Sequence, residues 1–141
     1  MSAPQPARAV IDLNADIGEV PGDEGRLLDE ALLRLVTSAS VACGGHAGTP
    51  TSARTTCLAA ARAGVAVGAH VSYVDREGFG RRRLDVAGPV LEAQLRRQLE
   101  TLELAAAAAG TAVTYLKPHG ALYHAAAADP EQAGAVITAA L

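Results

Sequence analysis

Two kinds of hydrophobic pattern alternate along the chain. Short apolar runs typical of strands occupy Ala9–Asp16, Ser38–Ala42, Val65–His70 and Ala112–Lys117. After each run, apolar residues recur every three or four positions, as they do on one face of a helix. These helical stretches run near Leu27–Val36, from Thr49-Pro50 to Gly64, from Gly88-Pro89 to Gly110, and onward from Asp129-Pro130. The pattern predicts four consecutive strand–helix repeats.

The expected helices carry recognisable start and stop residues. Thr49 followed by Pro50 is typical of an N-cap and a first helical residue, and Gly64 ends that helix. Asp129 repeats the start signal before another proline, and Gln132 stands where it would complete a capping box. These signals support the helix boundaries independently of the apolar pattern.

Strands that alternate with helices pair in parallel and are joined by right-handed crossovers. We therefore predict an α/β fold of four parallel βα units in a single domain over residues 9–141, after a short disordered lead at residues 1–8. Two architectures fit, an open doubly wound sheet and an arc of a (β/α) barrel. In both, ligands bind beyond the carboxyl ends of the strands.

The composition excludes some classes of function. Hydrophobic residues make up 50% of the 141 residues and the formal net charge is −3, which gives no reason to expect nucleic acid or an anionic membrane as partner. No apolar run approaches the roughly 20 residues that span a bilayer. Cys43 and Cys57 form no paired motif, so we expect two reduced thiols in a soluble, cytoplasmic protein.

Polar residues that are unusual in a buried strand mark the first strand. Asp12, Asn14 and Asp16 alternate with apolar residues and so share one face. An unpaired buried carboxylate costs several kcal/mol, so we expect these side chains to line a site. An exposed edge strand with one wet face is the alternative interpretation.

The second strand runs into the sequence Cys43-Gly44-Gly45-His46. The glycines allow a sharp turn whose backbone N–H groups can face an anion or an oxyanion, and His46 follows at the mouth of the expected site. Cys43 is close to His46 only in sequence, so we expect Cys43 to pack and not to act as a nucleophile.

The other two strands also end in titratable residues. His70 closes the third strand, and the loop after it, which contains Tyr73 and Arg81, is long enough to form a lid. The fourth strand ends in Lys117, followed by His119, and Lys117 is the single lysine among 12 Lys and Arg residues. A lysine kept in so arginine-rich a chain indicates a site that needs a compact ammonium.

Four segments together resemble the lactam-utilisation (LamB/YcsF) family, which is identified with the A subunit of the ATP-hydrolysing 5-oxoprolinase. The segments are Asp12–Glu19 (DLNADIGE), Thr37–Thr49 (TSASVACGGHAGT), Gly68–Arg82 (GAHVSYVDREGFGRR) and Tyr115–Tyr123 (YLKPHGALY). Their order and spacing agree with the family over nearly the whole chain. Family members have about 250 residues, the usual size of a (β/α) barrel, so this chain holds only the first four of the family's repeats.

The resemblance implies a partial (β/α) barrel related to the glycoside hydrolase and deacetylase barrels. It also implies ATP-dependent opening of a small lactam, 5-oxo-L-proline, to L-glutamate, together with 5-oxoprolinase subunits B and C. The chain has no GxxxxGK[ST] loop, so we expect ATP to be bound only with the partner subunits. Four βα units would leave two open sheet edges, which favours partner contacts or a homo-oligomer.

For this activity we expect a shared site at the strand ends. Asp16 and one histidine would act as general base and acid, and Lys117 would stabilise negative charge together with the Gly44 and Gly45 amides. The expected catalytic residues are Asp16, His46, His70, Lys117 and His119. The expected substrate-binding residues are Asn14, Gly44, Gly45, Tyr73 and Arg81.

Two other hypotheses stay open. In a metal-dependent, deacetylase-like hydrolase, Asp16 and two of the three histidines His46, His70 and His119 would hold Zn²⁺ or a similar divalent ion that activates water. In a non-catalytic half-barrel scaffold, the chain would only bind its partner subunits. Metal binding and activity of the isolated chain distinguish these hypotheses.

Overall fold

The four predicted strands form one parallel sheet. The computed structural model describes residues 10–141, so the lead predicted for residues 1–8 lies outside the described residues. The strands lie side by side in the order of the chain. They are β1 Asn14–Ile17, β2 Ser38–Ala42, β3 Ala66–Val71 and β4 Val113–Pro118. The predicted parallel pairing is confirmed.

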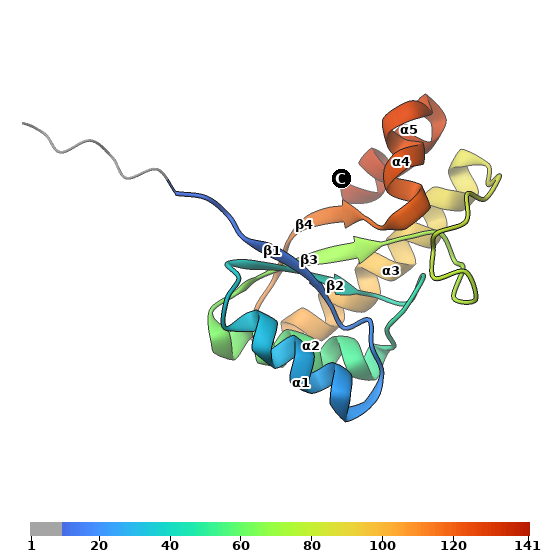
Figure 1. Ribbon diagram of the computed structural model, residues 1–141. Coiled ribbons are helices and arrows are strands. Elements are labelled where there is room, and N and C mark those ends of the chain that lie inside the picture. Colours follow the sequence, from blue (N-terminus) through green and yellow to red (C-terminus); the bar gives the residue numbers. More distant parts are fainter. Residues whose placement is uncertain (1–9) are drawn as a thin grey trace, which may run out of the picture.

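The part of the chain that the structure describes has five helices. They are α1 Gly22–Leu33, α2 Pro50–Ala63, α3 Gly88–Ala108, α4 Gly120–Ala128 and α5 Pro130–Ala140. Figure 1 shows α1, α2 and α3 together on one side of the sheet, with α4 and α5 next to β4. A doubly wound sheet reverses its strand order at a switch point, and the order of these four strands does not reverse, which favours an arc of a (β/α) barrel over the doubly wound alternative. Within residues 10–141, no helix is both long and apolar enough to cross a membrane.

The hydrophobic core lies between the sheet and these helices. The apolar stripe predicted for α3 is confirmed, because Leu91, Leu95 and Leu102 are fully buried and Leu99 is packed against them. Complete burial of one leucine contributes about 1.5–3 kcal/mol relative to its exposure. The helices therefore cover the apolar face of the sheet and leave the opposite face to polar side chains.

The capping signals are confirmed for one helix and in part for another. Thr49 caps α2, and Gly64 ends it in the left-handed region with φ of 69°. Asp129 caps α5 by accepting from backbone N–H groups of its first turn. The capping box predicted with Gln132 is wrong, since the Gln132 side chain turns inward and accepts a hydrogen bond from the Tyr73 hydroxyl.

Other boundaries differ from the predicted ones. β1 begins at Asn14, because Val10 and Ile11 lie exposed before the sheet. The predicted start at Ala9 lies outside the described residues. α1 starts at Gly22, five residues before Leu27, where the predicted helical stretch begins. Its first turn is polar and acidic, and such residues suit a helix N-terminus. α4 was not predicted at all. Its alanine-rich sequence, GALYHAAAA, has no amphipathic pattern to reveal it.

Candidate functional site

The carboxyl ends of the four strands bring five of the expected residues together. Asp16 is in β1, His70 in β3 and Lys117 in β4. His46 lies in the turn after β2 and His119 directly follows β4, and both side chains are buried. The site has two parts, a half-open group of polar residues on the face of the sheet and a buried histidine cluster beyond it.

The half-open part joins the two outer strands. Lys117 Nζ lies 2.5 Å from Asp16 Oδ1 and 3.2 Å from Asn14 Oδ1. Asn14 Nδ2 also donates to the Tyr115 hydroxyl at 2.6 Å. Gly68 makes room for this contact, because a Cβ there would lie 2.1 Å from the Tyr115 ring. Side chains of β1 and β4 thus meet across β2 and β3.

The buried part is a packed group of three imidazoles. The His46 and His119 rings are stacked, with centroids 3.6 Å apart and 10° between their planes. His70 meets both rings edge-on, at 5.3 and 4.8 Å between centroids. His70 also connects the cluster to the half-open part, because its Nε2 lies 3.3 Å from Asp16 Oδ2.

Glu19 completes the cluster, although it is not among the residues expected from the sequence. Its Oε1 lies 2.8 Å from His46 Nε2 and 3.7 Å from the nearest ring nitrogens of His70 and His119. Strand alternation places Glu19 on the face opposite Asp16. Gly18, with φ of 75°, turns the chain and brings Glu19 back. The signals in the sequence are that Glu19 follows a glycine directly after the strand and that it ends the Asp12–Glu19 segment of the family resemblance.

The outer nitrogen of each imidazole is also bonded. His46 Nδ1 lies 3.0 Å from Ser72 Oγ, and His70 Nδ1 lies 3.0 Å from the Lys117 carbonyl oxygen. His119 Nε2 lies 2.8 Å from the carbonyl oxygen of Phe79. Phe79 adopts a left-handed φ of 52°, which costs roughly 1–2 kcal/mol for a residue other than glycine. Such strain is typical of functional sites.

Burial, hydrogen bonds and nearby charges shift the pKa values of three groups here. Burial opposes ionisation of Asp16, but His70 and Lys117 outweigh it and hold the Asp16 pKa well below its usual range. Burial likewise opposes ionisation of Glu19, and the hydrogen bond with His46 and the charges of the cluster lower the Glu19 pKa overall. Burial lowers the pKa of His119, and the other two histidines act in the same direction.

The remaining expected residues lie outside this cluster. The Gly44 amide donates to the Ala47 carbonyl at 2.8 Å, within its own turn. Gly45 packs so closely that a Cβ would lie 2.3 Å from Ser72 Oγ. Tyr73 is fully buried in the core, where its hydroxyl donates to Gln132.

Arg81 and Cys43 have simpler environments. The Arg81 guanidinium lies 5.3 Å from the centre of the Phe79 ring, which itself contacts His46 and His119. Cys43 is buried, and burial raises the pKa of its thiol to about 12. As expected, Cys43 packs in the core and is not activated as a nucleophile.

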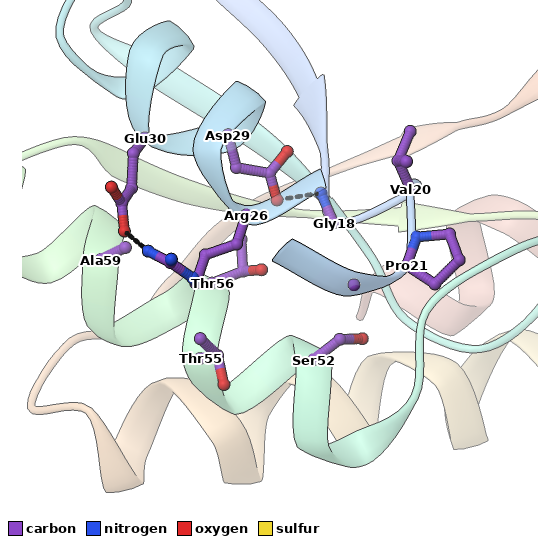
Figure 2. Close-up of a pocket in the computed structure, with 11 residues that line it drawn as sticks. Gly18, Val20, Pro21, Arg26, Asp29, Glu30, Ser52, Thr55, Thr56 and Ala59 are labelled. Carbon is purple, nitrogen blue, oxygen red and sulfur yellow. Dashed lines mark hydrogen bonds and ion pairs between the residues drawn. The ribbon is translucent and has the colours of Figure 1, made fainter. Parts of the chain in front are cut away.

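Two pockets flank the loop between β1 and α1. One pocket, of about 180 Å³, lies between α1 and α2. Figure 2 shows two interactions in its lining: Asp29 accepts a hydrogen bond from the Gly18 amide, and Arg26 forms an ion pair with Glu30. No strand-end histidine or lysine lines it. The other, of about 290 Å³, is lined by Glu19 and Arg76 and therefore leads toward the cluster.

The sequence is similar to known proteins of one family. The model of the LamB/YcsF family matches residues 11–141. A 5-oxoprolinase A subunit of Agrobacterium fabrum is 54% identical over 129 residues, which cover 92% of this chain and 51% of the relative. The 5-oxoprolinase A subunit of Streptomyces avermitilis is 53% identical over 128 residues, which cover 91% of this chain and 51% of the relative.

A solved structure agrees with this similarity. The crystal structure of the lactam utilization protein from Thermus thermophilus matches with a TM-score of 0.86 at 40% sequence identity. The match covers 92% of this chain and 52% of that one. The chain thus spans about half the length of the curated relatives and of the solved structure that it matches.

Proposed function

The chain belongs to the LamB/YcsF family, and on this basis we propose that it acts as the A subunit of 5-oxoprolinase, opening the lactam of 5-oxo-L-proline to L-glutamate with ATP hydrolysis. Relatives with that name at 54% and 53% identity support the reaction. The structural observation that carries the proposal is the half-exposed Asp16–Lys117 pair at the strand ends, next to a buried histidine cluster.

Opening a lactam requires three changes of bonding. Water adds to the ring carbonyl, the C–N bond breaks, and the nitrogen takes up a proton. Asp16 is placed to accept the proton of the attacking water, which is typically worth 10²–10⁴-fold in rate. Lys117 lies 2.5 Å from Asp16 Oδ1, so its ammonium reaches the same ligand and stabilises the oxyanion.

Neighbouring residues position these two groups. Asn14 accepts a hydrogen bond from the Lys117 ammonium at 3.2 Å, and His70 lies 3.3 Å from the other oxygen of Asp16. The Gly44 amide donates within its own turn, so we assign the oxyanion to Lys117 and not to Gly44. Arg81, in the loop beside the histidines, is our candidate for the substrate carboxylate because a guanidinium pairs well with that group.

We further propose that the sheet is an arc of a (β/α) barrel related to the glycoside hydrolase and deacetylase barrels. The strand order follows the chain, and polar side chains join β1 to β4 across the face opposite the helices. β1 and β4 each have one unpaired edge in this four-stranded sheet. Such edges are normally covered, and partner subunits or a second copy are our candidates for covering them.

The partners that we propose are 5-oxoprolinase subunits B and C, because the relatives are named as A subunits. ATP would be bound together with these partners, since the chain has no GxxxxGK[ST] loop. The two free, buried cysteines, Cys43 and Cys57, fit the reducing cytoplasm, where we place the enzyme.

Reconstitution tests this proposal. The chain is combined with subunits B and C of a relative, ATP and 5-oxo-L-proline, and the release of glutamate is measured. We expect glutamate formation that requires ATP and that Asp16→Asn lowers at least 10²-fold. Asp23→Asn, at an exposed carboxylate of α1, is the matched control. If the chain binds both partners and yields no glutamate, it is a scaffold and the enzymatic proposal is wrong.

A further inference from the structure

Two histidines of the buried cluster have their protons directed outward. His70 Nδ1 faces the carbonyl oxygen of Lys117 at 3.0 Å, and His119 Nε2 faces the carbonyl oxygen of Phe79 at 2.8 Å. A carbonyl oxygen only accepts hydrogen bonds, so each of these ring nitrogens carries a proton. In the neutral imidazoles the opposite nitrogens, His70 Nε2 and His119 Nδ1, therefore present lone pairs toward the cluster.

The tautomer of His46 follows from a hydroxyl group. His46 Nδ1 lies 3.0 Å from Ser72 Oγ, and Ser72 Oγ donates its own proton to the Tyr73 carbonyl at 2.8 Å. With its proton used there, the hydroxyl accepts from His46 Nδ1. When His46 is neutral, its other nitrogen, Nε2, therefore presents a lone pair as well, whereas only a protonated His46 donates from Nε2 to Glu19.

These three lone pairs converge on one another and on a carboxylate. His70 Nε2 and His119 Nδ1 are 3.1 Å apart, and His46 Nε2 lies 2.8 Å from Glu19 Oε1. All four atoms lie within 4.8 Å of one another. Acceptors packed this closely, without protons of their own between them, repel one another unless they share a cation.

We propose that Glu19, His46, His70 and His119 form a site for a divalent transition-metal ion of the zinc type. Zn²⁺ binds imidazole nitrogen and carboxylate oxygen at about 2.0–2.2 Å in a tetrahedron. That geometry places ligand atoms roughly 3.3–3.6 Å apart, which falls within the range of the distances, 2.8 to 3.7 Å, that join Glu19 Oε1 to the rings. When bound, the ion supplies a Lewis acid at the strand ends.

The surroundings support this site in two ways. The Ser72 hydroxyl and the carbonyls of Lys117 and Phe79 are the outer partners that fix the tautomer of a metal-binding histidine. Glu19, the carboxylate of the set, also lines the pocket of about 290 Å³ beside the loop between β1 and α1. The ligand set differs from the one expected from sequence, because Glu19 replaces Asp16, which is paired with Lys117. Metal binding does not require the lactam activity, so the inference goes beyond the proposed function.

Metal uptake by the purified 141-residue chain tests the proposal. The chain is stripped with a chelator, incubated with Zn²⁺ or Co²⁺, desalted and analysed for metal. We expect about one ion per chain, the intense visible absorption of tetrahedral Co²⁺, and a thermal midpoint that rises with Zn²⁺. Glu19→Gln and His119→Gln should weaken binding at least tenfold. His124→Gln, at the exposed histidine of α4 outside the cluster, should not.

Three results would overturn the proposal. The first is a folded wild-type chain that retains no metal and whose histidine ¹⁵N spectra show imidazolium rings at neutral pH, which would make the shared cation a proton. The second is equal affinity of the wild type and both ligand variants. The third, which needs no variant to fold, is a Co²⁺ spectrum of octahedral type. Metal uptake without any glutamate formation would leave this site intact and count against the enzymatic proposal alone.

Discussion

Lys117 Nζ lies 2.5 Å from Asp16 Oδ1, although β2 and β3 separate the strands that carry these residues. Neighbouring strands are about 4.8 Å apart, so a flat sheet would hold β1 and β4 roughly 14 Å from each other. Lys117 extends over the two inner strands, but the lysine and aspartate side chains together do not reach across a flat sheet, so the sheet must curve toward this face. Gly68 on β3 leaves space there for the Tyr115 ring. The site therefore depends on both outer strands at once.

Lys117→Arg tests whether the ammonium acts in the reaction. Arginine keeps the positive charge but replaces a compact group by a planar fork with different donor directions. We expect kcat/KM for glutamate formation in the reconstituted enzyme to fall at least 10²-fold, with little change in the thermal midpoint. Arg62→Lys, on the exposed side of α2, is the control. Unchanged kinetics in Lys117→Arg would assign Lys117 a purely structural role.

Gly68→Ala probes the contact across the sheet. The new Cβ would lie 2.1 Å from the Tyr115 ring, so the ring must move and its hydrogen bond with Asn14 is strained. Overpacking of this kind typically costs about 1–3 kcal/mol, measurable by urea denaturation. Gly134→Ala on α5 meets no atom within 4 Å and should stabilise by about 0.5–1 kcal/mol. Equal stability of the two variants would contradict the close packing at Gly68.

Tyr73→Phe separates a core role from a substrate-binding role. Removal of the hydroxyl leaves the buried Gln132 Oε1 without its donor at 2.8 Å, which costs about 1–3 kcal/mol of stability. We expect a lower free energy of unfolding and an unchanged KM for the lactam. Tyr123→Phe, at an exposed position on α4, should change neither. A raised KM in Tyr73→Phe would show that Tyr73 contributes to substrate binding.

Thiol labelling tests the burial of the two cysteines. Burial raises the pKa of Cys43 to about 12 and that of Cys57 to about 11. A raised pKa lowers the thiolate fraction, so at pH 8 the folded chain should react with a thiol reagent far more slowly than a free cysteine does. The rate should rise as the pH approaches 11, and both thiols should react at once in denaturant. Rapid labelling of Cys43 in the folded chain at pH 8 would show an activated thiol.

The sequence by itself determined the four strands, most of the helices and the position of Asp16, His46, His70, Lys117 and His119 at the strand ends. These features follow from local rules. Apolar spacing distinguishes strand from helix, and a Thr49-Pro50 start or a Gly64 stop acts within one turn. The carboxyl ends of parallel strands meet at one edge of the sheet, so residues at those ends come together whatever the rest of the packing is.

The tertiary structure alone decided which side chains complete the site. Glu19 is part of the site because Gly18 reverses the alternation of the strand. Tyr73 is not part of it, because its hydroxyl donates a hydrogen bond to Gln132, 59 residues later in the chain. α4 lacks an amphipathic pattern, so no local periodicity could reveal it. The inward lone pairs depend on Ser72 and on two distant carbonyls. Contacts between residues far apart in sequence set these features, and local hydrophobic spacing carries no record of them.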